Sequence, residues 1–512
     1  MRKLLLLFSI LLIGVTAQAQ IIDEGTCGAN LTWVLTADGT LTISGKGNMY
    51  DYSTGGAPWY SNCNSITTLV IGEKVNSIGK FAFSDCSKLT NISIPEDITT
   101  IEDGAFYNCG SLENVRLEDG AGVLAIKSYN MNAFDGCQIT DLYIGRDLRT
   151  MGGIDYSPTF NDQKFLETLT IGDKYVTSIR ASDFSGCVSL ANVTIGSKVT
   201  KIGSSAFSGC NSLPSIILPN TPVFTEIGSF AFSDCSKLTN ISIPGNVTII
   251  ENGAFYNCGS LENVRLEDGC EELAIKSYTG IAGMNAFNGC QITDLYIGRN
   301  LRTMGGSDYS PTFNDQKFLE TLTIDGCVTS IRASDFSGCV SLKKVIIGNK
   351  VNEIGDYAFY GCCELEKIIC YPTKPPIIHE NTFGGCGKSI HNFAILIDCK
   401  YLPAYKDAQY WSDFINYRSI DTQEQCELSI ENITSSQFLI YPNPTIGELR
   451  IENGELRIEN VTIFDIYGRI QKAECKKLKE EILVDISSLP VGVYFLRITT
   501  EQGEVMRKIL KE

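Results

Sequence analysis

Cysteine and histidine are the residue types with the greatest capacity for chemistry, and their numbers in this chain are very unequal. The chain contains 20 cysteines and only 2 histidines, His379 and His391. Histidine is the commonest general base and metal ligand, so its scarcity argues against catalytic triads and most metal centres. Both histidines lie near Cys386, in a glycine-rich segment whose spacing suits no metal site. We therefore predict no metal site and no cofactor.

Acidic residues are the second group with catalytic potential. Pairs such as Glu118 with Asp119, or Asp162 with Glu167, could imitate the two carboxylates of a glycosidase. Such pairs are common in an acidic chain, and this one has 59 acidic against 42 basic residues and a formal charge of -17. No nucleophile, base and orienting group can be named together, so we predict that the protein is not an enzyme. The same charge argues against nucleic acid or anionic lipid as the main partner, because both require a basic surface.

Most of the cysteines occupy one position of a repeated pattern, three residues after a phenylalanine, and we call these the landmark cysteines. The interval from Cys86 to Cys109 is 23 residues, and the same interval follows Cys187 and Cys339. Each interval contains two apolar residues separated by one residue, then usually Pro or Gly, and finally Ala-Phe. Residues two apart share one face of a strand. The pattern therefore predicts a short strand, a turn, and a helical or irregular return whose phenylalanine packs onto the strand.

A single coil of this kind cannot bury its apolar face alone, so the coils must stack around one continuous core. We count about 13 coils between Cys63 and Cys386, with Gln163 and Gln316 in place of two landmark cysteines. The predicted fold class is an α/β-type repeat solenoid of the leucine-rich repeat type, with a parallel sheet on one face.

Stacking also decides what the landmark cysteines can do. Equivalent residues of neighbouring coils lie roughly 4.8 Å apart with parallel Cβ directions, which is further than the roughly 3.5–4.5 Å that a disulfide prefers. We predict a ladder of buried free thiols, with disulfides between neighbours or metal binding as weaker alternatives. Cysteines outside the ladder are better disulfide candidates, and Cys370 with Cys399 is the favoured pair because both end strand-like runs.

A longer repeat lies over the coils, because residues 83–190 recur almost unchanged at 232–342. Two insertions are duplicated with it, and they contain tyrosines that could contact a ligand. The alternative is that these tyrosines only cover the longer coils. Outward polar residues of the strands, such as Asn91 and Ser93, offer a second candidate surface. The four candidate contact residues in the insertions are Tyr129, Tyr156, Tyr278 and Tyr309.

The two ends have different compositions from the coils. Arg2 and Lys3 precede an apolar run that is too short to span a membrane and closes with small residues, as in a signal peptide cleaved after Ala19. Alternating strands with turn residues predict an antiparallel β-sandwich at the C-terminus. The predicted organisation is a signal peptide (1–19), an N-terminal β-hairpin cap (20–62), the solenoid (63–386), a C-terminal cap (387–420), a linker (421–438) and the β-sandwich (439–512).

The coils resemble the BspA-like leucine-rich repeats of bacterial and protist surface proteins. That family has the signature Ile-Gly-x-x-Ala-Phe-x-x-Cys, which residues 78–86 and 202–210 match in full. The resemblance covers residues 25 to 420 or nearly so, and the opening hairpin around Asp38 is similar too. It implies a leucine-rich repeat fold and a role in adhesion or binding at a cell surface.

The C-terminal segment resembles the type A sorting domain of type IX secretion substrates. Four ordered motifs carry the resemblance, and their residues are Tyr441, Pro442, Asn443 and Pro444, then Gly468 and Arg469, then Gly492 and Tyr494, and finally Lys508 and Lys511. The resemblance implies that the type IX machinery recognises this domain, and that the protein is secreted or attached to the outer membrane of a Gram-negative bacterium.

Together these features predict a non-catalytic surface or secreted protein that acts as an adhesin or macromolecule-binding protein, with an extracellular protein or glycan as its ligand. A structural surface spacer without a dedicated ligand is the first alternative. A carbohydrate-active hydrolase is the least favoured one, because no set of catalytic residues can be named.

Overall fold

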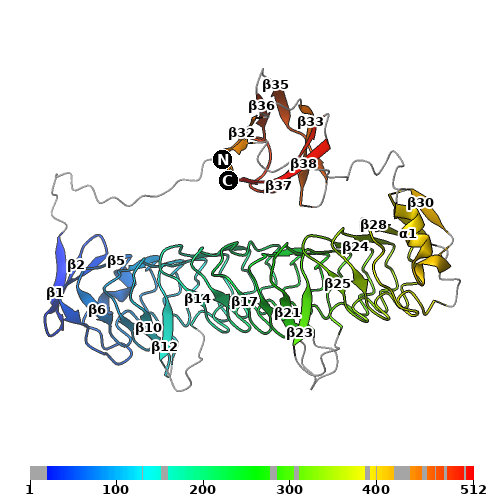
Figure 1. Ribbon diagram of the computed structural model, residues 1–512. Helices are drawn as coiled ribbons and strands as arrows, with labels where there is room; N and C mark the ends of the chain where they lie inside the picture. Colours follow the sequence, from blue (N-terminus) through cyan, green and yellow to red (C-terminus); the bar gives the residue numbers. More distant parts are fainter. Residues whose placement is uncertain are drawn as a thin grey trace. The chain divides into compact units, whose positions relative to one another are not determined.

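The structure is a computed structural model (Figure 1) that describes residues 20–129, 131–151, 159–276, 285–304, 311–386, 393–398, 401–414, 416–419, 439–452, 458–466, 469–477, 481–500 and 503–512. The chain forms two compact units, the first of Met1–Ile395 with Pro403–Tyr417 and the second of Leu396–Leu402 with Arg418–Glu512. The expected signal peptide and linker lie outside the described residues. Among the described helices, none is long and apolar enough to cross a membrane.

An antiparallel hairpin closes the N-terminal end of the coils. Asp38 and Gly39 form its tight turn, where Gly39 has a φ of 83°. The Asp38 carboxylate accepts hydrogen bonds from the Thr36 hydroxyl at 2.6 Å and from the Thr40 amide at 3.2 Å. The last hairpin strand then pairs in parallel with the first coil, so the hairpin covers an edge that would otherwise be exposed. The strands are β1 (Ile21–Gly28), β2 (Leu31–Thr36) and β3 (Thr40–Gly45).

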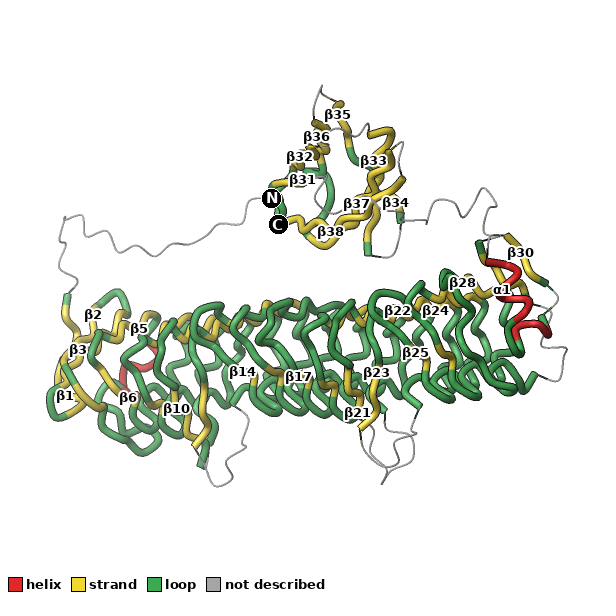
Figure 2. Tube along the Cα trace, viewed as in Figure 1, coloured by secondary structure: helices red, strands yellow, loops and turns green. Residues whose placement is uncertain are grey.

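Strands from successive coils stack in a parallel row, which we call the first row (Figure 2). Strand pairing within the described residues stops between Thr194 and Asn240, so the first row consists of two sheets. Neighbouring strands pair in register, with Ile92 opposite Val115 and Ile94 opposite Leu117. These four side chains are buried, whereas Ser93, between Ile92 and Ile94, is exposed. The predicted parallel sheet is therefore confirmed. Its strands are β5 (Thr68–Ile71), β7 (Asn91–Ile94), β9 (Asn114–Leu117), β11 (Asp141–Ile144), β13 (Thr168–Ile171), β15 (Asn192–Thr194), β18 (Asn240–Ile243), β20 (Asn263–Leu266), β22 (Asp294–Ile297), β24 (Thr321–Ile324), β26 (Lys344–Ile347) and β28 (Lys367–Cys370).

A second row of shorter parallel strands follows the turn in each coil, and we call these the lateral strands. Within the described residues they form three separate sheets, so their pairing stops after β12 and again after β23. The most N-terminal of these three lateral sheets contains β4 (Gly47–Asn48), β6 (Val75–Ile78), β8 (Thr100–Ile101), β10 (Leu124–Lys127) and β12 (Leu148–Met151). The other two contain β14 (Ser178–Ile179), β16 (Lys201–Ile202), β17 (Glu226–Ile227), β19 (Ile249–Ile250), β21 (Leu273–Lys276) and β23 (Leu301–Met304), then β25 (Ser330–Ile331) and β27 (Glu353–Ile354).

One aromatic ring from each coil joins a continuous stack through the core. The stack begins at Trp59 and Phe83, whose centroids are 5.5 Å apart, and runs to Phe383. Most consecutive centroids are 5.2 to 5.5 Å apart, but Phe160 and Phe184 are 6.4 Å apart. Offset stacking at this distance adds favourable ring contacts to the burial of each ring. We call this feature the aromatic stack.

The return half of each coil consists of turns with almost no helix. The residue before each landmark cysteine has a positive φ, such as 61° at Asp85, 59° at Asn108 and 74° at Gly209. A left-handed residue interrupts a right-handed helix, and Asp, Asn and Gly tolerate this conformation best. The α/β-type label therefore describes the repeat family better than these coils. The described helices are the 3-10 segments η1 (Tyr60–Ser65) and η3 (Trp411–Asp413) and the α-helix α1 (Leu402–Asp407).

Large aromatic residues close the C-terminal end of the array. Trp411 is fully buried, lies 6.3 Å from Phe383 between ring centroids, and donates its indole N–H to the Pro376 carbonyl at 2.7 Å. The buried Tyr405 hydroxyl donates to the Pro372 carbonyl at 3.0 Å. These side chains occupy the place where a further coil would pack. The strands of this region are β29 (Ala394–Ile397) and β30 (Tyr417–Ser419).

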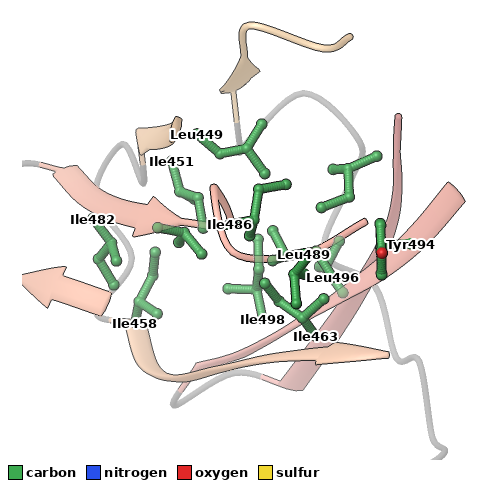
Figure 3. Close-up of a cluster of buried hydrophobic side chains, with 13 residues drawn as sticks. Leu449, Ile451, Ile458, Ile463, Ile482, Ile486, Leu489, Tyr494, Leu496 and Ile498 are labelled. Carbon is green, nitrogen blue, oxygen red and sulfur yellow. The ribbon is translucent and has the colours of Figure 1, made fainter. Parts of the chain in front are cut away.

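The C-terminal strands form two four-stranded antiparallel sheets around a core of their own (Figure 3). Leu449 and Ile451 from one sheet, and Leu496 and Ile498 from the other, are fully buried in it. The predicted antiparallel sandwich is confirmed. One sheet has the order β31 (Leu439–Tyr441), β32 (Glu448–Glu452), β36 (Glu481–Asp485) and β35 (Glu474–Lys477), and the other β34 (Ile470–Gln471), β33 (Ile458–Asp465), β37 (Gly492–Thr500) and β38 (Gly503–Lys511).

Candidate functional site

The outward side of the first row of strands, which we call the sheet face, is a regular polar surface of the coils. Alternation along each strand turns the first and third residues outward. In β7 and β9 these residues are Asn91, Ser93, Asn114 and Arg116, all exposed. The amide of Asn114 donates to the side-chain oxygen of Asn91 at 2.7 Å. The sheet face can therefore offer ordered hydrogen-bonding groups to a ligand.

A cluster of arginine, tyrosine and aspartate lies on the sheet face. The Arg116 guanidinium carbon is 3.8 Å from the centre of the Tyr143 ring, a cation–π contact. The Tyr143 hydroxyl donates to Asp119 at 2.5 Å, and Arg116 Nε donates to Glu118 at 2.9 Å. Burial, followed by the Asp119 carboxylate, raises the pKa of Tyr143 to about 12. This phenol therefore stays protonated and donates its hydrogen bond at neutral pH.

The duplicated segment builds the same cluster a second time. The Arg265 guanidinium carbon is 3.6 Å from the centre of the Tyr296 ring, and the Tyr296 hydroxyl donates to Asp268 at 2.6 Å. Sequence reasoning missed both clusters, because their members come from different coils. The signal was present in the repeat itself, since Arg and Tyr hold the third position of consecutive strands in both copies.

Of the four predicted contact tyrosines, the structure describes only Tyr129. Its side chain is 56% exposed, and its backbone N–H donates to the Asp103 carboxylate at 2.7 Å. It follows β10 and is therefore available to a ligand. Tyr156, Tyr278 and Tyr309 lie outside the described residues. Whether the four tyrosines form a site stays a prediction.

The landmark cysteines from Cys86 to Cys362 have free, buried thiols, in agreement with the predicted ladder, whereas the last one, Cys386, is disulfide-bonded. Each free landmark thiol from Cys109 to Cys362 donates to the carbonyl of the phenylalanine one coil earlier, as Cys109 does to Phe83 at 3.1 Å and Cys235 to Phe207 at 3.2 Å. Burial raises the pKa of Cys187 to about 12. The thiolate is the reactive form, so these thiols are inert at neutral pH. Their role is to satisfy a buried carbonyl.

The structure contains a disulfide that differs from the predicted one. Cys363 is bonded to Cys386, with a Cα–Cα distance of 5.2 Å. Cys370 has a free thiol, fully buried, and Cys399 lies outside the described residues, so the predicted Cys370–Cys399 bond finds no support. The observed bond joins neighbouring coils. Cys363 comes directly after the landmark Cys362, and Cys362 is the residue equivalent to Cys386. The bond therefore joins non-equivalent positions, to which the argument from parallel Cβ directions does not apply.

No group of three or more potential metal ligands occurs among the described residues. His379 is exposed, with Nε2 3.9 Å from the Glu353 carboxylate, and His391 lies outside the described residues. The acidic pairs named above lie on the surface: Glu118 is engaged with Arg116, and Asp119 with Tyr143.

Two buried arginines also escaped sequence reasoning. Arg146 reaches back two coils and donates to the carbonyls of Pro95 at 2.7 Å, Glu96 at 2.6 Å and Ile98 at 2.8 Å, and Arg299 repeats the arrangement. Burial lowers the pKa of Arg146 to about 10, so the guanidinium remains charged. Each arginine lines a cavity of about 10 Å³, which is no larger than one water molecule. These arginines brace turns and leave no space for a substrate.

The sorting-motif residues are largely structural within the C-terminal sandwich. The Asn443 side chain donates to the Lys508 carbonyl at 2.9 Å and accepts from the Leu510 amide at 2.8 Å. Lys511 is buried, and its ammonium donates to the carbonyls of Ser487, at 2.6 Å, and Leu489. The first and last motifs therefore meet in space.

The two middle motifs each fix a turn of the sandwich. Arg469 Nε donates to the Asp465 carboxylate at 2.8 Å, and the Tyr494 hydroxyl donates to the Pro490 carbonyl at 2.8 Å. Gly492 opens β37. Tyr441 is the last residue of β31, and Pro442 and Pro444 follow directly after this strand. Gly468 lies outside the described residues.

Comparison with known families gives two matches. The model of the BspA type leucine rich repeat region matches residues 56–157, 154–282 and 307–406. The model of the secretion system C-terminal sorting domain matches residues 439–512. None of the curated proteins matches the chain.

Several solved structures are similar to this chain. A leucine-rich repeat protein from Bacteroides ovatus is 20% identical, covers 76% of this chain and 98% of its own, and has a TM-score of 0.28. A leucine rich cell surface protein from Faecalibacterium prausnitzii is 22% identical, covers 79% and 96%, and has a TM-score of 0.23. A leucine-rich repeat protein from Eubacterium ventriosum is 20% identical, covers 69% and 86%, and has a TM-score of 0.25.

The sorting domain makes the protein a substrate of type IX export, which carries it to the cell surface or releases it from the cell. The repeat model spans more than half of the chain. By its solenoid, the chain belongs to the BspA-type leucine-rich repeat family.

Proposed function

We propose that this exported protein is a non-catalytic adhesin, which binds an extracellular protein or glycan through its solenoid. The observation that carries the proposal is the sheet face, a regular polar surface whose Arg–Tyr–Asp cluster occurs in two copies. Two equal sites on one chain can bind a repetitive ligand by avidity. Membership of a family of surface repeat proteins and the sorting domain support the same role.

The insertions are the second part of the proposed binding surface. Tyr129 is exposed beside β10, and the sequence repeats this insertion at Tyr278. Exposed tyrosines are frequent anchors in interfaces, because a rigid amphipathic ring loses little entropy on binding. Tyr156 and Tyr309 complete the four candidate contacts in the proposal.

A glycan and extracellular-matrix array tests the proposal. The exported chain is applied at two salt concentrations, together with a variant in which Tyr129, Tyr156, Tyr278 and Tyr309 are alanine. Saturable binding that the variant weakens supports a site on the insertions. Saturable binding that the variant retains supports the adhesin and moves the site to the sheet face. A folded, monodisperse sample that binds nothing on the array contradicts the adhesin.

A structural spacer is the second candidate, and the aromatic stack favours it. An unbroken core from Trp59 to Phe383 suits a rod that holds a fixed length. A spacer predicts no dependence of attachment on the number of intact copies. Altering one copy of the Arg–Tyr–Asp cluster and then both distinguishes the two candidates, because avidity makes the double change more harmful than one change alone.

A further inference from the structure

The sheet face has a charge pattern that the proposed adhesin function does not by itself explain, and the inference drawn from it rests on that function. The outward residues of the strands are mainly Thr, Ser and Asn, which are neutral hydrogen-bonding groups. Carboxylates border this strip on both sides. Those directly before the strands are Glu113, Glu167, Glu262, Glu320 and Glu366, and those directly after or one further on are Glu73, Glu96, Glu118, Asp119, Asp173, Glu267, Asp268 and Asp325.

Few basic groups neutralise these carboxylates. Seven bases lie on the strip or its borders, but Arg146 and Arg299 are buried and bonded to backbone carbonyls. The other five are Arg116, Arg265, Lys343, Lys344 and Lys367. Two of them are already engaged there, because Arg116 is paired with Glu118 at 2.9 Å and Lys343 with Glu320 at 3.0 Å. Glu113, Glu167 and Glu262 are exposed and form no ion pair with any described residue.

The spacing of the unpaired carboxylates selects an extended ligand. Glu113 and Glu167 precede β9 and β13, which are separated by one strand, so they stand roughly 10 Å apart along the array. Carboxylates spread in this way do not converge on one point, in agreement with the lack of any metal-ligand group among the described residues. A single metal ion cannot contact them together, but a chain with several positive charges can.

The molecule itself shows how the sheet face holds a cation. The guanidinium carbon of its own Arg116 lies over the Tyr143 ring at 3.8 Å from the ring centre, and Arg116 Nε donates to Glu118. Asp119 accepts a hydrogen bond from the Tyr143 hydroxyl and so fixes the ring. Arg265 on Tyr296 repeats the arrangement at 3.6 Å. Aromatic rings and carboxylates together are a favourable environment for guanidinium and ammonium groups.

We infer that the sheet face binds an extended, lysine- or arginine-rich segment of a protein partner. Cationic side chains of the segment pair with the unpaired carboxylates, and the neutral strip between them accepts and donates hydrogen bonds to the segment. Charge complementarity of this kind sets the choice of partner and the rate of association. The duplication of residues 83–190 at 232–342 lengthens the strip of this chain and adds to the avidity for the partner.

Fluorescence anisotropy on the full exported chain tests the inference. The probe is a labelled peptide of about 20 residues with lysine at every third position and Gly or Ser elsewhere. In an extended peptide, lysines three residues apart are separated by roughly the same distance as Glu113 and Glu167. A second peptide carries glutamine in place of lysine. The protein variants are Glu113→Gln/Glu167→Gln/Glu262→Gln on the sheet face, and Glu226→Gln/Glu271→Gln/Glu353→Gln away from it, which changes the net charge equally.

We expect the lysine peptide to bind, the glutamine peptide not to bind, and the affinity to fall as salt rises. The sheet-face variant weakens binding roughly tenfold, since it removes three exposed pairs, and the control variant changes it less than about twofold. Equal weakening by both variants overturns the inference, because it indicates attraction to net charge alone. Thermal midpoints within the error of the parent chain show that both variants are folded.

The outcome also separates this inference from the proposed function. Binding to a neutral glycan on the array, without binding of the lysine peptide, overturns the cationic partner and leaves the adhesin standing. A chain that binds neither the peptide nor the array contradicts both.

Discussion

Replacing one ring of the aromatic stack tests whether the stack holds the coils together. Phe207 lies in the middle of the array, is fully buried, and has its ring 5.5 Å from Phe184 and 5.4 Å from Phe232 between centroids. Phe207→Ala removes the ring but leaves the backbone carbonyl that accepts the Cys235 thiol at 3.2 Å. The change is therefore confined to packing.

The expected loss is large for a single residue. Truncation of a buried phenylalanine costs about 3–5 kcal/mol, which includes the cavity that remains. The two stacking contacts account for about 1–3 kcal/mol of this, at about 0.5–1.5 kcal/mol each. Because each coil contacts only its neighbours, the loss falls on the two interfaces beside Phe207, and we expect the unfolding transition to split in two.

Urea denaturation followed by circular dichroism measures the effect, and Phe165→Ala is the matched control. Phe165 is a phenylalanine of the same array, but its side chain is 51% exposed and lies outside the stack, so we expect a loss below about 0.5 kcal/mol. A loss at Phe207 below about 1 kcal/mol, or equal to the loss at Phe165, would refute the role of the stack.

Three further predictions follow from single groups. Burial raises the pKa of the Cys187 thiol to about 12, so Cys187 should resist alkylation at pH 8 in the native chain and react in urea. The exposed Cys270 should react under both conditions. Mass spectrometry of labelled peptides measures the difference, and rapid labelling of Cys187 in the native chain would contradict its burial. Lys511→Met should lower the stability of the C-terminal unit by about 1–3 kcal/mol, because the buried carbonyl of Leu489 and the part-buried carbonyl of Ser487 lose their donor. Lys508→Met, at an exposed side chain, should have little effect. Proteolysis of the unit measures both, and equal sensitivity would count against the buried lysine. Hydrogen bonds from Thr36 and Thr40 lower the pKa of Asp38 in the folded chain. Asp38 therefore contributes stability above its unfolded pKa of about 3.9, and this stability is lost as the pH falls through the lower folded pKa. The difference in stability between the parent chain and Asp38→Ala should shrink on acidification through this range, and a constant difference would disprove the linkage.

The sequence was sufficient for the features that repeat in every coil. The 23-residue interval, the buried pair of each strand and the phenylalanine before each landmark cysteine are periodic, so stacking follows from them directly. The sequence also contained a signal that the described return halves consist of turns with almost no helix. Asp85, Asn108 and their equivalents are residue types that tolerate a positive φ, which interrupts a helix.

Features that join non-equivalent residues of different coils could not be predicted in the same way. Arg146 bonds to carbonyls about two coils earlier, 48 and 50 residues away, and no local pattern specifies that reach. Tyr143 and Arg116, by contrast, hold the same position of consecutive strands and meet because these strands pair in register, so the repeat did contain the signal for this contact. The disulfide of Cys363 and Cys386 joins a landmark cysteine to the residue after one, so the argument from equivalent positions did not cover it.

The two interruptions of the lateral strands have a consequence for a protein that is pulled while attached. Between β12 and β14, and again between β23 and β25, no lateral strand pairing links the described coils. Phe160 and Phe184 are 6.4 Å apart at the first interruption, and Phe313 and Phe336 are 6.2 Å apart at the second, so the core contacts are looser there too. At these two junctions only the first row still pairs among the described strands, β11 with β13 and β22 with β24. The first row is in turn interrupted between β15 and β18, but there the lateral strands pair and the rings of Phe207 and Phe232 are 5.4 Å apart. A load along the array therefore extends the two junctions with the looser core first, and the solenoid yields as three mechanical segments with the disulfide-bonded end in the last.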